Sequence, residues 1–196
     1  MREIRTEGII LSCNWLREGH LLLRIFTPLE GIVICSISSK KNALPSPLSR
    51  VEIILKQKQE GFFRCEELHE ISLYLPLRKN FSLLQSASRL LTSIEASQWK
   101  HHPSQELYKL LISYLDKMMA GFSAEILCVS FVLKLLKYEG IWDPFFVEVP
   151  IGFSQEEADI LLFLTEVKSY QQLGLVSLSM DLQKKIMKFF EDCLEN

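Results

Sequence analysis

The stretch GIVICSISSKKNALPSPLSRVEIILKQK, residues 31–58, decides the architecture of the N-terminal part of the chain. Its two ends are rich in isoleucine, valine and leucine, and apolar residues alternate there with small or polar ones. This pattern predicts two strands, at residues 32–37 and 51–56, joined by a loop that contains prolines and serines. The chain therefore places a small sheet here, with a long loop leaving it.

The loop within this stretch is basic. It contains Lys40 and Lys41, and Arg50 stands where the second strand begins. No Asp or Glu occurs between Glu30 and Glu52. A basic loop at the edge of a sheet indicates a place where phosphate groups bind.

Three further apolar runs extend the predicted sheet. Residues 7–14 and 20–27 precede the stretch, and residues 62–75 follow it as one or two strands. Short turns between neighbouring runs imply antiparallel pairing. About five short strands with no helix of useful length suggest a small closed barrel, in which one face and its loops bind single strands if the barrel is of the OB type. Composition alone does not distinguish an OB barrel from an SH3-like one.

The apolar period changes from 2 to about 3.6 after Pro76, which is typical of helices. We therefore predict two domains, residues 1–76 and residues 77–196. The fold class is α+β, with an N-terminal OB-fold barrel followed by an all-α bundle of five or six helices. The helices are expected at residues 81–99, 104–121, 124–138, 155–167, 168–174 and 179–196.

Charge is distributed unevenly along the chain, whose formal net charge is −2. Residues 1–60 hold nine Lys or Arg and six Asp or Glu, whereas residues 61–196 hold thirteen and eighteen. This difference favours a local anion site in the N-terminal part over a surface that binds polyanions everywhere.

The five cysteines are widely spaced, which is typical of reduced thiols in a cytosolic protein. No secretory signal and no apolar stretch of membrane-spanning length is visible, so we expect a cytoplasmic location and no membrane partner. No C-x-x-C pair, Walker A loop, G-x-G-x-x-G fingerprint or G-x-S-x-G elbow occurs. We therefore expect no metal, no cofactor and no enzymatic activity.

Basic residues of the predicted barrel are the candidates for DNA binding, because cations on one face neutralise successive phosphates. Three aromatic residues, Trp15, Phe62 and Phe63, are candidates for stacking on bases. The alternative is that the basic residues keep the barrel soluble and the aromatic residues fill its core. The candidate cations are Arg17, Arg24, Lys40, Lys41, Arg50 and Lys56.

The apolar helix expected at residues 124–138 suggests a second site, for a protein partner. An apolar groove with lysines at its rim receives a short amphipathic or acidic tail. The alternative is that these lysines only extend from the edge of a buried helix to solvent. The candidates for this site are Lys109, Leu133, Lys134 and Lys137.

The order of several phrases along the chain resembles RecO, a family of bacterial recombination mediators. The resemblance covers roughly residues 4–145. It rests on T-E-G-I-I-L at residues 6–11, Glu18-Gly19, F-T-P-x-x-G at residues 26–31, the S-K-K loop, Leu77-Arg78, E-L-Y-K-L-L at residues 106–111 and F-V-L-K-L-L-K-Y-E-G-I-W-D-P at residues 131–144.

The resemblance implies an OB fold followed by a helical domain. It implies binding of single- and double-stranded DNA, annealing of complementary strands and loading of RecA, an indirect partner, onto DNA coated with single-strand-binding protein. RecR is the usual partner, and the nucleoid is the expected place of action. Lys40 and Lys41 match the loop that holds DNA in the family, and Lys134 lies in the helix that matches the one receiving the C-terminal tail of single-strand-binding protein.

One feature departs from the family. Many members carry a four-cysteine zinc module, whereas residues 144–192 of this chain contain no cysteine. We therefore expect a zinc-less variant with a metal-free segment near residues 143–153. The alternative to a DNA-binding mediator is a protein-interaction adaptor whose barrel binds no nucleic acid.

Overall fold

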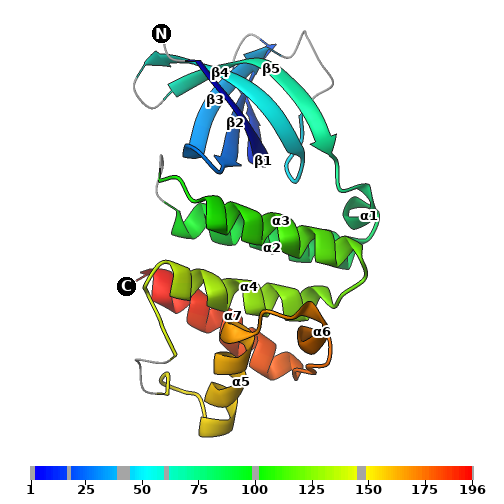
Figure 1. The fold of residues 1–196 in the computed structure, drawn as a ribbon, viewed down its shortest axis with the longest axis vertical. Coiled ribbons are helices and arrows are strands. Elements are labelled where there is room, and N and C mark those ends of the chain that lie inside the picture. The colour runs from blue at the N-terminus through cyan, green and yellow to red at the C-terminus, as the bar shows by residue number, and fades with distance from the viewer. Residues whose placement is uncertain are drawn as a thin grey trace. The chain divides into compact units, whose positions relative to one another are not determined.

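The computed structural model describes residues 3–16, 19–38, 45–59, 62–98, 102–144 and 149–195. The chain forms two compact units, which Figure 1 shows as a barrel of strands and a group of helices. The first unit contains residues 1–79 and 98–110, and the second contains residues 80–97 and 111–196. The domain boundary proposed at residue 76 lies close to the first passage of the chain between the units.

The strands of the first unit form a closed barrel in the order β1-β2-β3-β5-β4, and β4 pairs again with β1. Only the β3–β5 pair is parallel. The prediction of an OB-like barrel followed by helices is confirmed, with a single strand after residue 61. The strands are β1 (Glu3–Trp15), β2 (His20–Thr27), β3 (Gly31–Ser38), β4 (Arg50–Gln59) and β5 (Phe62–Ser72).

Alternation along the strands builds the interior of the barrel. In β4, Val51, Ile53 and Leu55 are fully buried, whereas Glu52 and Ile54 between them are partly exposed. Full burial of an aliphatic side chain of this size contributes about 1.5–3 kcal/mol. All five strands contribute such residues to one cluster, so the barrel is a packed core and not a pore.

The first unit also buries apolar residues outside the barrel interior. Phe26 of β2 is fully buried, and its ring lies against Tyr108, with 5.9 Å between ring centroids. Gly31 begins β3 with φ +67°, and a Cβ built there would lie 2.5 Å from the backbone oxygen of His102. Residues 98–110 therefore belong to the fold of the barrel unit.

Helix α4 is the centre of the second unit. It is buried on nearly every face and packs against α2, α5 and α7. Ser154 and Glu157 form the capping box predicted before α5. No helix in the described ranges is long and apolar enough to cross a membrane. The helices are α1 (Leu75–Arg78), α2 (Phe81–Ser97), α3 (Gln105–Met119), α4 (Ala124–Tyr138), α5 (Gln155–Glu166), α6 (Tyr170–Leu173) and α7 (Met180–Glu195).

The close approach of Gly31 and His102 predicts a large effect of Gly31→Ala. The new methyl group meets backbone atoms, and the backbone conformation is strained for alanine, so we expect the free energy of unfolding to fall by about 2–4 kcal/mol in urea titrations. Gly140→Ala is the matched control, because Gly140 has φ +68° and nothing within 4 Å of a built Cβ. It should lose only about 1 kcal/mol. Equal losses in the two variants would contradict the proposed backbone contact.

Candidate nucleic-acid interface and peptide groove

Among the described residues, the outer face of β2 and β3 carries Arg24. Neither strand contains an Asp or Glu. Arg24 alternates with the buried Leu23 and Ile25, so it belongs to the outer side of β2, in register with Ile34 of β3. In OB folds this face and the β1–β2 and β4–β5 loops bind oligonucleotides.

The strands β1, β4 and β5 hold the acids of the barrel, and cations neutralise several of them. The hydrogen bond from Arg5 lowers the pKa of the Glu52 carboxyl. These contacts leave a mixed surface with little excess positive charge. The ion pairs, by nitrogen–oxygen distance, are Arg5–Glu52 at 3.0 Å, Arg50–Glu7 at 2.7 Å, Lys56–Glu3 at 3.5 Å and Arg64–Glu66 at 3.3 Å.

The structure does not bring Arg24 together with Arg50 and Lys56. The latter two lie on β4, and β1 separates β4 from β2 on that side of the barrel. Arg50 is half-buried and donates two hydrogen bonds to Glu7, at 3.2 and 2.7 Å. The interpretation of Arg50 and Lys56 as phosphate ligands on a common face with Arg24 therefore has no support in the geometry, because each contacts a carboxylate of β1.

The other predicted cations, Arg17, Lys40 and Lys41, lie outside the described residues. The strand ends that lead to them are described, however. The Leu16 amide donates to the His20 carbonyl at 2.8 Å, and His20 is in register with Ser38, the last residue of β3. The described strand ends next to these three residues in the sequence therefore lie at one end of the barrel.

The aromatic candidates differ in exposure. Phe63 is 1% exposed and belongs to the barrel core, so its interpretation as a stacking surface was wrong. Phe63 alternates along β5 with residues that point outward. The sequence did not predict which residues of this strand would point into the barrel. Phe62 is partly buried, whereas Trp15 is 66% exposed.

The predicted partner residues of α4 are occupied within the second unit. Leu133 is fully buried. The Lys134 ammonium donates to the carbonyls of Thr165 and Val167, at 2.9 and 2.6 Å, where α5 ends. A cation is favourable at a helix C-terminus, although burial lowers the pKa of Lys134.

The two remaining candidates do not complete a groove on α4. Lys137 contacts Glu166 at 2.6 Å and Asp143 at 3.7 Å. Lys109 is exposed but belongs to the first unit. Leu133, Lys134 and Lys137 therefore make contacts within the second unit, and neither lysine simply extends to solvent as the alternative interpretation expects.

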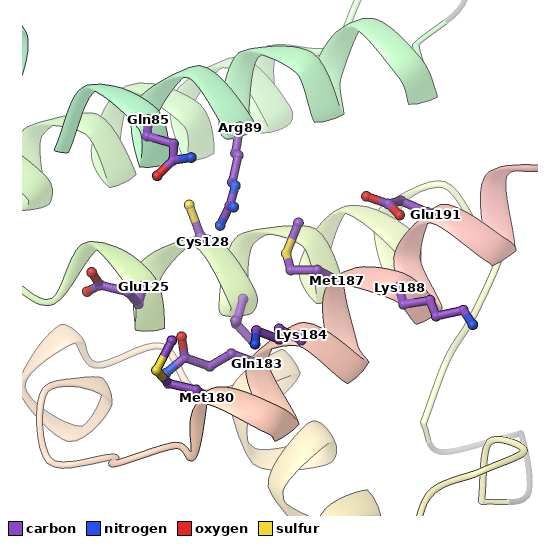
Figure 2. Close-up of a pocket in the computed structure, with 11 residues that line it drawn as sticks. Gln85, Arg89, Glu125, Cys128, Met180, Gln183, Lys184, Met187, Lys188 and Glu191 are labelled. Carbon is purple, nitrogen blue, oxygen red and sulfur yellow. The ribbon is translucent and has the colours of Figure 1, made fainter. Parts of the chain in front are cut away.

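A groove of about 400 Å³ lies instead between α2, α4 and α7 (Figure 2). Its floor includes Cys128, whose pKa burial raises to about 12, so the thiol is protonated and apolar in character. A second hollow of about 330 Å³ shares Arg89, Met187 and Glu191 with it and continues along α2 and α7. The two hollows are therefore neighbours on the surface that α2 and α7 share.

Three cations and the two carboxylates of Glu125 and Glu191 line this α2–α7 groove. Arg89, Lys184 and Lys188 line it, and within the described ranges none of the three forms an ion pair. Met180 and Met187 add flexible apolar surface. The sequence contained a signal for this groove, because Met180, Lys184 and Met187 follow each other at helical spacing on α7.

No group of three or more His, Cys, Asp or Glu side chains that would hold a metal occurs among the described residues. The segment expected to be metal-free near residues 143–153 is only partly described, since residues 145–148 are outside these ranges.

The contacts of Lys134 predict a structural effect of Lys134→Met. Methionine keeps the apolar stem but leaves the carbonyls of Thr165 and Val167 without their donor, so we expect a loss of about 1–3 kcal/mol in the free energy of unfolding. Lys109→Met is the control and should change stability by less than about 0.5 kcal/mol. Chemical denaturation followed by circular dichroism measures both. An unchanged Lys134→Met protein would show that this contact contributes nothing to the fold.

Comparison with known proteins agrees with the barrel and the helices. No protein-family model matches the chain. The DNA repair protein RecO of Chlamydia pneumoniae is 26% identical over 147 residues, which cover 72% of this chain and 58% of the relative. RecO of Chlamydia trachomatis serovar L2 is 24% identical over 98% of this chain and 93% of its own length. RecO of Streptococcus pyogenes serotype M49 is 23% identical over 94% and 86%.

The second of these matches extends over 228 aligned residues, more than the 196 of this chain, so the relative contains segments that this chain lacks. The matches nevertheless run from the barrel through the helices. The order of the phrases, the closed barrel and the near full-length similarity agree, and the chain is similar to the RecO proteins from the barrel through the helices.

Proposed function

We propose that the chain is a DNA repair mediator without enzymatic activity. It binds single- and double-stranded DNA through the barrel, anneals complementary strands and helps to load RecA onto DNA coated with single-strand-binding protein. RecR is a partner, and the cytoplasmic nucleoid is the place of action. The acid-free face of β2 and β3 carries this proposal, because Arg24 lies there and Arg17, Lys40 and Lys41 follow in sequence from one end of the barrel.

The mechanism is electrostatic. Phosphates that contact lysine and arginine release bound counterions, which gives affinity without sequence preference. The net charge of −2 and the ion pairs on β1, β4 and β5 restrict this effect to one side of the barrel. Neutralised strands repel each other less, so two complementary strands held near this surface pair more readily.

The second unit binds the C-terminal tail of single-strand-binding protein in this mechanism, and we assign the tail to the α2–α7 groove. Arg89, Lys184 and Lys188 attract its carboxylates, and Met180 and Met187 receive apolar side chains. The groove differs from α4, since none of its three cations forms an ion pair within the described ranges, although Glu125 and Glu191 also line it. Docking there brings the barrel to single-stranded DNA that is already coated.

A protein-interaction adaptor is the second candidate function. The ion pairs that neutralise Arg5, Arg50 and Lys56 favour it, because they remove cations from the barrel surface. An adaptor of this kind passes through a DNA-cellulose column at low salt, whereas the mediator is retained.

The DNA-binding proposal predicts the behaviour of Lys40→Gln/Lys41→Gln. Each lost phosphate contact on a single strand reduces the slope of log affinity against log salt by about 0.7, so the double variant should lose about 1.4. Affinity for labelled single-stranded DNA at low salt should fall about tenfold or more, and strand annealing should slow. Fluorescence anisotropy at several salt concentrations measures the slope.

The matched control is Arg5→Gln/Lys56→Gln, which removes the same charge from the ion-paired surface of β1 and β4. We expect its salt slope to equal that of the wild type. The assignment of the site fails if both double variants lose the same slope, or if neither does.

The peptide groove predicts an effect of Lys184→Glu. An acidic tail peptide then meets a repelling charge, and its dissociation constant should rise about five- to tenfold, as for a partly exposed charge. Lys109→Glu is the control, because Lys109 is also an exposed lysine on an amphipathic helix. Titration of a labelled peptide with each protein measures both. Weaker binding only in Lys109→Glu would support the partner site predicted from the sequence and would exclude the groove.

A further inference from the structure

The two hollows of the α2–α7 groove differ in charge. Both lie within the second unit. Three cations, Arg89, Lys184 and Lys188, line the first hollow beside two carboxylates. The second hollow is lined by Glu191 and Glu195, and among the described residues Arg89 is its only cation. The balance of charge therefore changes from positive to negative between one hollow and the next.

The order of the lining residues along the helices gives this change a direction. Residue numbers on α2 and on α7 both rise from the first hollow to the second, so the two helices pass the hollows in the same order. Figure 2 shows Met180 and Glu125 toward one end of the first hollow, Glu191 toward the other end, and Arg89 between them. An extended ligand in the groove therefore passes the cations before it reaches Glu191 and Glu195.

The carboxylates of the second hollow are exposed. Within the described ranges, neither Glu191 nor Glu195 forms an ion pair or a side-chain hydrogen bond. Glu125, at the other end of the groove, differs, because it accepts hydrogen bonds from the hydroxyls of Ser82 and Ser123, at 3.4 and 3.2 Å. The charges of Glu191 and Glu195 therefore act on whatever occupies the second hollow.

The remainder of the second hollow is largely apolar. Its volume is about 330 Å³, and its walls include Ala96, Met187, Phe190 and Leu194. An apolar side chain gains buried contact there without an electrostatic cost. A ligand carboxylate would lose part of its hydration beside two like charges. The first hollow has the opposite preference, because its three cations attract carboxylates.

We propose that Glu191 and Glu195 are specificity-determining residues that confine the negative charge of a bound protein segment to the first hollow. The segment that fits carries carboxylates in one part and uncharged apolar residues in the next, whereas a segment with a carboxylate at every position is rejected. This inference rests on the proposed binding of a tail in the groove and adds what the groove excludes. Repulsion of the wrong ligand supplies selectivity that attraction by three cations alone does not.

The test uses two labelled octapeptides with blocked ends, one with four aspartates followed by four apolar residues and one with eight aspartates. Glu191→Gln/Glu195→Gln should bind the all-aspartate peptide about fivefold more tightly than the wild type does, because two partly screened repulsions are removed. The dissociation constant of the half-apolar peptide should stay within about twofold, because its carboxylates do not reach the second hollow. Fluorescence anisotropy at low salt measures both constants, and equal urea midpoints show that the variant is folded.

The matched control is Glu156→Gln/Asp159→Asn, which removes the same charge from exposed positions of α5, whose described residues line neither hollow. It should leave both dissociation constants within about twofold of the wild type. The specificity role is overturned if the groove variant gains equally on both peptides, if it gains nothing on the all-aspartate peptide, or if the control gains as much. The groove itself stands in those cases, provided that Lys184→Glu weakens the half-apolar peptide. A wild-type protein that binds neither peptide would overturn the specificity role together with the proposed groove.

Discussion

The pairing of β4 with β1 closes the barrel, and the distribution of charge over the first unit depends on it. The register runs from Glu3 opposite Lys56 to Ile9 opposite Arg50. It brings the acids of β1 beside the cations of β4, which lie more than forty residues away in sequence. A shift by one residue would turn Val51, Ile53 and Leu55 outward, so the packing of the core fixes this charge pairing. The acid-free face of β2 and β3 is the part of the barrel that the pairing leaves out.

The second unit depends in a similar way on α4. The Ser130 hydroxyl donates to the Leu164 carbonyl at 2.8 Å, and Lys134, one turn later, donates to two further carbonyls near the end of α5. Both contacts satisfy carbonyls that the end of a helix leaves without partners. These residues face α5, which leaves another side of α4, with Glu125 and Cys128, to line the groove with α2 and α7. One side of this apolar helix therefore packs in the core of the unit, and another side lines the groove at the surface.

Much of the fold followed from periodicity, because alternation and helical spacing are local properties. The strand His20–Thr27 and the helix Ala124–Tyr138 have the predicted bounds. Contacts between distant residues did not follow. Nothing in the sequence near Tyr108 shows that it covers Phe26, or that His102 approaches Gly31, and residues 98–110 were expected in the helical domain.

The candidate sites show the same limit. The sequence around Arg50 does not show that Glu7 lies beside it. The sequence around Lys134 likewise does not show that its ammonium contacts the end of α5. The resemblance to RecO predicted a partner site on the matching helix, but the predicted side chains of that helix contact other residues of the second unit. The spacing of Met180, Lys184 and Met187 on α7 was readable, yet it becomes a groove only when α2 lies opposite.

The charge of the two units gives a physical reason for the two binding sites of the proposed function. The barrel carries few uncompensated cations, and the chain as a whole is slightly acidic, so its attraction for DNA is short-ranged at physiological salt, where screening acts over about 8 Å. In the proposed function, docking on a protein that already coats single-stranded DNA replaces long-range steering by a high effective concentration near the strand. Under the proposed function, a weak, local phosphate site then suffices.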